Sequence, residues 1–303
     1  MATVAIKESK TDKIYLVINY LFLVIALIVV LYPLLYIISA SISDPKYVSS
    51  GEMWLFPKGL NLKGYKLVFD NPKIWSGYGN TIMYTVLGTM VNLVVTLPAA
   101  YSLSRPDFVG RKFFMGMFLV TMFFNGGLIP TYLLVKGLGL INSIGALILP
   151  TTVSVYNLIV ARTFFESSIP KELNEAAYID GCTNFKLFIR IIIPLSAPII
   201  AVMALFYGVG HWNSYFPALI YLNDEAKYPL QMILRQILVL QEMSADTTVA
   251  ASGDAAIAMN NKAEIAALVK YAVIIVSTLP IIIVYPFLQR YFVQGVMIGS
   301  VKG

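Results

Sequence analysis

Two carboxylates and three very small residues lie close together in one segment of this chain. Glu175 is followed at once by Ala176 and Ala177, and Asp180 is followed by Gly181. Carboxylates accept strong hydrogen bonds from arginine and from backbone N–H groups. Small side chains let the backbone of another protein approach closely. The chemistry that this pattern predicts is therefore polar docking onto a partner, and not bond making or bond breaking.

The same segment carries the start and stop signals of a short helix. Pro170 suits the first position of a helix, and Glu172 lies near that N-terminus, where the helix dipole favours negative charge. Gly181 permits a left-handed ending after about three turns. The spacing places four residues on one face: Leu173, Ala176, Ala177 and Asp180. We interpret the segment as a plug for a socket in a cytoplasmic partner. The alternative is a helix lying on lipid headgroups, which would carry bulky apolar residues and a basic face.

Other reactive chemistry is scarce. Cys182 is the only cysteine and His211 the only histidine, so neither a disulfide within the chain nor a His/Cys metal centre is expected. No Ser/His/Asp arrangement is visible, and no phosphate-binding Gly-x-x-x-x-Gly-Lys-Ser/Thr loop occurs. The sequence therefore predicts no enzyme activity, no metal and no cofactor in this chain.

The elements that must position this segment are membrane helices. Hydrophobic residues make up 58% of the chain and charged residues 13%, whereas a soluble domain has about 25% charged residues. The net charge of +6 fits the Lys and Arg that membrane proteins gather on the cytoplasmic side, and no nucleic-acid-binding motif accompanies it. We expect an all-α integral membrane protein with six transmembrane helices, over 14–43, 78–104, 113–135, 141–164, 191–222 and 268–291.

Orientation follows from the Lys and Arg of the connections. With a cytoplasmic N-terminus at 1–13, just over half of the basic residues fall on the inner side. This predicts both termini inside (N-in and C-in) and the plug inside, as a cytoplasmic coupling helix between spans four and five. Two long outer loops, 44–77 and 223–265, then face outward. They are either functional or plain solvated connections.

One motif resembles that of a known family. The pattern of Glu175-Ala-Ala, Gly181 and Ile191-x-Ile193-Pro194 resembles the EAA loop of binding-protein-dependent ABC importer permeases. The family usually has Leu where this chain has Ile193. In that family the loop is the coupling helix that docks on the ATPase subunit. The resemblance implies that six residues couple to the ATPase: Glu172, Glu175, Ala176, Ala177, Asp180 and Gly181.

Further motifs are similar to the sugar branch that includes the maltose permeases. Asn80-Thr81, the stretch from Ala99 to Arg105, and Trp212-Asn213 match that branch, while 124–132 and 228–231 resemble the LplC/YtcP-type permeases for oligosaccharides and polysaccharides. The C-terminal tail also matches, which implies a second ATPase contact, unless the terminus merely frays, at Gly299, Ser300, Val301, Lys302 and Gly303.

The resemblance implies a whole assembly in a bacterial cell membrane. It includes a second, non-identical permease subunit, a cytoplasmic ABC ATPase dimer that holds ATP and Mg, and an extracellular solute-binding protein. The chain itself would be a multi-pass permease that imports a sugar by alternating access. A basic sequence without nucleic-acid motifs implies no nucleic-acid partner.

Polar and aromatic residues inside the expected spans are candidates for the substrate path, because such groups usually face the bundle interior. They are Tyr84, Asn92, Asn125, Tyr156, Asn157, His211, Trp212 and Asn213. The competing interpretation is structural, since aromatics form interfacial belts and asparagines bond across helices.

Two other functions compete with an ATP-driven importer. An ion-coupled secondary carrier commonly needs carboxylates or broken helices in the membrane. Six prolines could break helices here, but no carboxylate accompanies them: Pro33, Pro98, Pro150, Pro194, Pro198 and Pro280. A membrane scaffold that transports nothing is the second rival. The EAA pattern argues against both.

Overall fold

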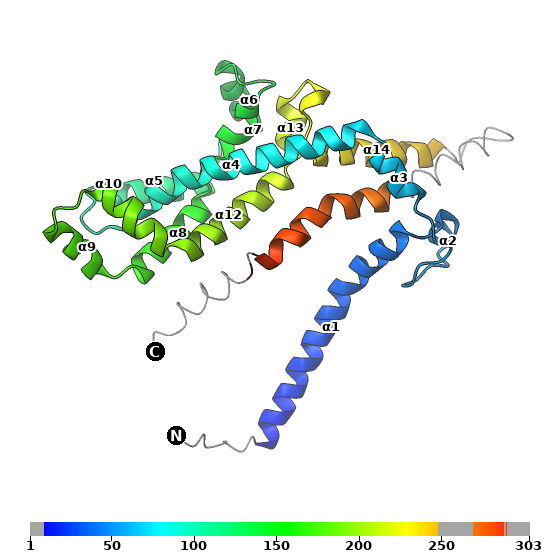
Figure 1. Ribbon diagram of the computed structural model, residues 1–303, viewed down its shortest axis with the longest axis horizontal. Coiled ribbons are helices and arrows are strands. Elements are labelled where there is room, and N and C mark those ends of the chain that lie inside the picture. Colours follow the sequence, from blue (N-terminus) through cyan, green and yellow to red (C-terminus); the bar gives the residue numbers. More distant parts are fainter. Residues whose placement is uncertain (1–8, 248–268, 288, 290–303) are drawn as a thin grey trace. The chain divides into compact units, whose positions relative to one another are not determined.

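The fold was analysed in a computed structural model that describes residues 9–247, 269–287 and 289. Helices account for all the regular structure of these residues (Figure 1). The chain forms two compact parts, and each is described by itself. The first combines 1–70 with 237–276, and the second combines 71–236 with 277–303.

The first part contains α1 (Lys10–Ser41), α2 (Pro45–Ser49) and α3 (Lys63–Phe69). Ser9 caps α1 reciprocally, since its hydroxyl accepts from the Asp12 N–H at 3.1 Å and its own N–H donates to the Asp12 carboxylate at 2.9 Å. The middle of α1 is apolar on every side and long enough to cross a membrane. Pro33 lies within this helix without breaking it.

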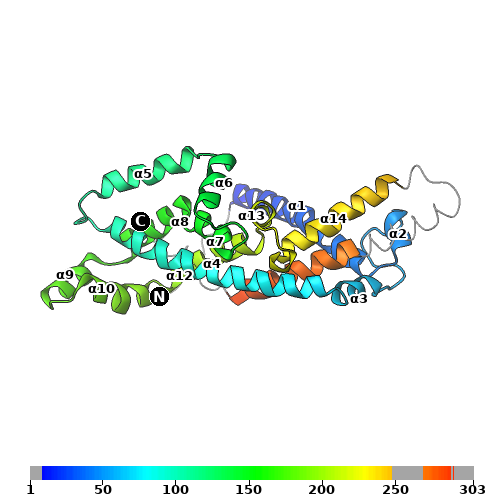
Figure 2. The same ribbon diagram turned by 90° about the horizontal axis from the view of Figure 1, so that it is seen from above.

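The second part is built around α4 (Pro72–Ser104), which packs against α8 (Val155–Ser168) and α12 (Ala197–Trp212) (Figures 1 and 2). Small residues sit where these helices meet: Ala100 of α4 and Ala161 of α8 are fully buried. Small side chains let membrane helices approach closely, which helps this packing because lipid supplies no hydrophobic drive between helices.

Within the described residues, three helices are long and apolar enough to span a membrane: α1, α4 and Val269–Phe287. The spans predicted as continuous over 113–135, 141–164 and 191–222 are each broken. Helices α5 (Arg111–Phe123) and α6 (Leu128–Gly137) meet at 114°, and the segments Ile144–Thr151 and α8 meet at 53°. Asn184–Leu195 and α12 meet at 81°. The described residues therefore hold up to six spans if each bent pair counts as one.

Glycine and proline explain where these helices break. Between α5 and α6, Gly127 has φ +84°, and its N–H donates to the Asn125 side chain at 2.8 Å. Pro150 lies in the 3-10 turn η1 (Leu149–Thr151) that follows α7 (Ile144–Ile148). Pro194 and Pro198 flank the last break; neither has a backbone N–H to continue the helical hydrogen bonds.

The two segments predicted as long outer loops contain helices. Helix α4 begins at Pro72, within the predicted loop 44–77, because the Asn71 side chain caps it by accepting from Lys73 N–H at 3.0 Å. The predicted loop 223–265 opens with η3 (Glu225–Lys227) and α14 (Leu230–Thr247), after α13 (Phe216–Tyr221). Helix α14 therefore occupies a large part of the stretch predicted as a loop. The rest of that loop and the tail 299–303 lie outside the described residues.

Candidate functional site

The predicted coupling helix is present as α9 (Lys171–Ile179), between α8 and α10 (Asn184–Leu187). Both views place α9 at one end of the second part, near the C-terminal end of α4 (Figures 1 and 2). Pro170 is the residue that precedes the helix, and not its first residue, because its ψ of 138° is extended.

The end of α9 is closed by a left-handed glycine, as the sequence predicts. Gly181 has φ +68°. Its N–H donates to Tyr178 O at 3.1 Å, and Cys182 N–H donates to Ala177 O at 2.9 Å. These two bonds are the Schellman motif, which satisfies carbonyls that would otherwise lack partners at the helix end. The segment therefore leaves α9 in one defined direction.

Replacing Gly181 by alanine tests this ending. No atom lies within 4 Å of the added Cβ, so the cost comes from the left-handed backbone alone, about 1–2 kcal/mol. We expect Gly181→Ala to lower the thermal stability of the purified protein. Gly116→Ala in α5 is the matched control, because its Cβ also meets open space and its φ is ordinary. Equal melting temperatures for the two variants would contradict the expectation.

The four residues predicted to share one face of α9 differ in burial. Ala177 is 6% exposed and belongs to this chain's own hydrophobic core, and Leu173 is half-buried. Ala176 and Asp180 point the other way and are exposed. Only Ala176 and Asp180 of the four are therefore available to a partner in this structure, and docking by this face stays a prediction. The small size of Ala177 serves packing within the chain.

The exposed side of α9 adds two residues that sequence reasoning missed. Tyr178 is 72% exposed and Ile179 is 87% exposed. The available signal was their position three and four residues after Glu175, which puts all three on one side of the helix. We call the following set the coupling surface: Glu172, Glu175, Ala176, Tyr178, Ile179 and Asp180. Apolar side chains surrounded by polar ones are the ordinary composition of a protein interface.

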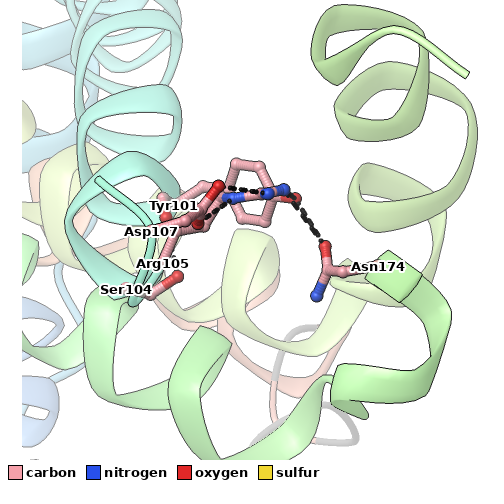
Figure 3. A network of polar contacts seen from close by, with 5 residues as sticks. All are labelled: Tyr101, Ser104, Arg105, Asp107 and Asn174. Carbon is pink, nitrogen blue, oxygen red and sulfur yellow. Dashed lines mark hydrogen bonds and ion pairs between the residues drawn. The ribbon is translucent and has the colours of Figure 1, made fainter. Parts of the chain in front are cut away.

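A polar network joins α9 to the end of α4 (Figure 3). The Tyr101 hydroxyl donates to Asn174 Oδ1 at 3.0 Å, and Arg105 donates to the same oxygen at 3.4 Å. Arg105 also donates to both carboxylate oxygens of Asp107, at 2.8 Å and 2.7 Å. The hydrogen bonds from Arg105 hold the pKa of Asp107 below its usual range. Because the pKa is lowered, this ion pair is retained at neutral pH and lost only as the pH falls through that lowered value.

A second set of ion pairs joins the helices that precede α9 in the chain. Glu166 of α8 pairs with Arg111 of α5 and with Arg162 one helical turn away, the latter at 2.6 Å. Arg162 Nε also donates to Leu103 O of α4 at 3.0 Å. These ion pairs and this hydrogen bond therefore join α4, α5 and α8 close to the point where the chain passes from α8 to α9.

Two residues predicted for the substrate path, Asn92 and His211, are hydrogen-bonded within the chain. The Asn92 side chain is completely buried, and its Nδ2 donates to Thr151 O and Thr152 O at 2.9 and 2.7 Å. Its Oδ1 can then only accept, so His211 Nε2, 2.6 Å away, is the donor. These bonds satisfy carbonyls at the break before α8, as backbone in a membrane requires. The structural interpretation of Asn92 and His211 therefore accounts for both.

The remaining candidates are dispersed. Tyr84 donates to Lys227 O at 2.8 Å, Asn157 is buried in α8, and Asn125, Tyr156 and Asn213 are exposed. Trp212 borders a cavity of about 380 Å³ that is lined by α4, α12 and residues 280–284. The cavity is apolar except for the hydroxyls of Thr85 and Thr89, which are buried and have no hydrogen-bond partner among the described residues.

Comparisons with known proteins agree with this architecture. Residues 1–298 match the family "Binding-protein-dependent transport system inner membrane component". The chain is 43% identical to Protein LplC of Bacillus subtilis (strain 168), over 98% of this chain and 97% of that protein. It is 39% identical to the polygalacturonan/rhamnogalacturonan transport system permease protein YtcP of the same organism, over 96% and 99%.

A solved structure is similar as well. It is the crystal structure of a bacterial ABC transporter involved in the import of the acidic polysaccharide alginate. The match has a TM-score of 0.82 and 34% identity, and it covers 95% of this chain and 100% of that chain. The chain therefore belongs to the family of inner membrane components of binding-protein-dependent transport systems.

Proposed function

We propose that this chain is a permease subunit of an ABC importer of saccharides, in which the coupling surface of α9 docks on a cytoplasmic ATPase. The observation that carries the proposal is helix α9. It is exposed, has defined ends, lies at the EAA pattern, and belongs to a chain of this family. A helix with both ends defined can transmit a push, whereas a loose loop would absorb it. A secondary carrier or a scaffold would have no use for such an element.

The assembly and its topology are part of the proposal. The chain would span the bacterial cytoplasmic membrane six times, with both termini inside, beside a second permease that is not identical to it. Two ATPase subunits would bind ATP and Mg, and an extracellular solute-binding protein would deliver the sugar. The match of family and length to LplC, YtcP and the alginate importer supports these partners.

The substrate we propose is an oligosaccharide. The names of two relatives specify polygalacturonan/rhamnogalacturonan and the acidic polysaccharide alginate, so uronate oligomers head the set to be tested. The test is thermal stabilisation of the matching solute-binding protein by neutral and by acidic oligosaccharides. Each substance that stabilises it should then be taken up by the complete transporter, and stabilisation by non-saccharides alone would contradict the proposal.

Sidedness of α9 can be tested with one engineered thiol. Cys182 is the only cysteine, so Cys182→Ser gives a cysteine-free background in which Glu175→Cys is the single label site. A maleimide that cannot cross membranes should label it in inverted vesicles and leave it unlabelled in intact cells. Glu52→Cys, in the segment expected outside, is the control with the opposite pattern. Labelling of Glu175→Cys in intact cells would refute cytoplasmic docking.

The C-terminal tail is a second proposed contact with the ATPases. Its basis is the resemblance of Gly299, Ser300, Val301, Lys302 and Gly303 to the tail of maltose-type permeases. We expect deletion of 299–303 to reduce uptake while the permease still reaches the membrane in normal amount. Uptake at the wild-type rate would remove the tail from the mechanism.

For the substrate path, we retain Trp212 as the candidate that borders a cavity. Its indole N–H already donates to Ser277 O at 3.1 Å, so the part of the ring that borders the cavity, and not the N–H, would meet a sugar ring. Thr85 and Thr89 line the same cavity, and their buried hydroxyls have no hydrogen-bond partner among the described residues, so a side-chain rotation would let them bond to a sugar.

A further inference from the structure

Tyr101 contacts three helical elements: α8, α9 and η2. Its ring lies edge-to-face with Phe165 of α8 at 5.7 Å between centroids, and at 5.1 Å from Phe188, where the π-helical stretch η2 (Phe188–Ile192) begins. Its hydroxyl donates to Asn174 in α9. One side chain of α4, itself 6% exposed, therefore joins the segments before, within and after the coupling helix.

Arg105 holds the same connection from one turn further along. The two-bond pairing with Asp107 fixes the plane of its guanidinium, since both ends of that fork are engaged. The remaining nitrogen NH1 then faces the Tyr101 hydroxyl at 3.2 Å and Asn174 Oδ1 at 3.4 Å (Figure 3). Asn174 thus receives one donor from Tyr101 of α4 and one from Arg105 directly after that helix, and no other described element supplies a hydrogen bond to that oxygen.

Helix α4 carries the connection through the second part without a break. It contains 33 residues and is about 50 Å long at 1.5 Å per residue. Near its other end Asn80 donates to Ala226 O at 2.7 Å and to Tyr228 O at 3.1 Å. Halfway along, Asn92 binds the carbonyls at the break before α8. A shift of its inner end therefore reaches both the middle and the outer end of the bundle.

We propose that Tyr101 and Arg105 are positioning residues that latch α9 to α4 through Asn174, so that a displacement of α9 is delivered to α4. The proposal rests on the proposed function, because the displacement would come from an ATPase docked on α9. Without the two donors, α9 remains attached to the chain through the Ala177 packing and its covalent connections. It can then move without pulling α4 with it. Variants that lack these donors should therefore take up less substrate per ATP hydrolysed, while the transporter still assembles with its ATPase.

Tyr101→Phe isolates the latch, since it removes one hydroxyl and keeps both ring contacts. We expect uptake per ATP hydrolysed to fall about fivefold in proteoliposomes that hold the complete transporter, the factor that one ordinary hydrogen bond supplies. Asn174→Leu should give a similar loss. Asn174→Asp should keep the wild-type ratio, because a carboxylate oxygen still accepts from both donors. The double variant Tyr101→Phe with Asn174→Leu should be no worse than the single ones.

Tyr20→Phe is the matched control, since it removes the same atom from an exposed tyrosine of α1. The amount of ATPase that co-purifies is measured for every variant. A wild-type ratio for Tyr101→Phe, or a fall in ratio that merely follows a loss of ATPase from the complex, would overturn the latch. If no ATPase co-purifies with the wild-type chain, the proposed function itself fails, which is a different result.

Discussion

A tryptophan at position 176 should abolish coupled uptake. Ala176 is exposed in the middle of the coupling surface, so Ala176→Trp changes nothing in this chain's own core. A docked partner would meet a large ring where it now meets a methyl group. The loss of fit at the centre of an interface costs about 2 kcal/mol or more, which corresponds to at least about a thirtyfold weaker contact. We expect uptake to fall by about that factor.

Two measurements make this result specific. The amount of permease in the membrane should be unchanged, while the amount of co-purifying ATPase should fall together with uptake. Val109→Trp is the control, because Val109 is 91% exposed and lies on the turn between α4 and α5, which is also expected to be cytoplasmic. Uptake and ATPase binding at wild-type levels in Ala176→Trp would show that α9 docks on nothing at this position.

A methyl group at position 88 should destabilise the second part strongly. Gly88 of α4 faces the His211 ring of α12, and an added Cβ would lie 2.5 Å from Nε2, 2.6 Å from Cε1 and 2.8 Å from Cδ2. The ring cannot simply turn away, because Nε2 is bonded to Asn92. Overpacking of this kind costs about 1–3 kcal/mol, and the displaced hydrogen bond adds about 1 kcal/mol.

The measurement is thermal unfolding of the purified protein in detergent, with the amount of protein in the membrane as a second readout. Gly79→Ala is the control within the same helix, since its Cβ meets no atom within 4 Å. Alanine favours a helix by about 1 kcal/mol over glycine, so Gly79→Ala should be neutral or stabilising. Adding His211→Ala to Gly88→Ala makes room for the methyl group and should recover part of the loss. A double variant no better than Gly88→Ala would contradict the clash.

Helix α9 could be predicted from sequence because its boundaries are set locally. Pro170 and Gly181 act on the backbone at their own positions, so they mark the ends of α9 whatever surrounds it. The apolar runs likewise reveal membrane helices without knowledge of their neighbours. The breaks at Gly127 and near Pro194 had visible signals, yet Pro33 and Pro98 lie in unbroken helices. Proline alone therefore does not decide whether a span bends.

The contacts of α9 could not be predicted in the same way. Tyr101 and Asn174 are 73 positions apart in sequence, and nothing in either residue's neighbourhood points to the other. Whether Ala176 or Ala177 faces inward depends on the packing of Phe165 and Phe188, which sequence spacing does not contain. The same holds for Asn92, whose role in the break before α8 requires α4, η1 and α12 to meet. Pairings across the fold decide these roles, and local patterns do not.

The position of Tyr101 between Phe165 and Phe188 bears on how such transporters can be recombined. A chimera that exchanges only the stretch from α8 to η2 would keep the recipient's residue at position 101. That residue would then pack against the donor's residues at positions 165 and 188. The smallest transplantable module is therefore discontinuous: the segment around α9 together with the last turn of α4 and the residues just after it, Arg105 and Asp107. Hybrids that exchange both pieces should keep ATP hydrolysis coupled to uptake. Hybrids that exchange the α8–η2 stretch alone should hydrolyse ATP with little uptake.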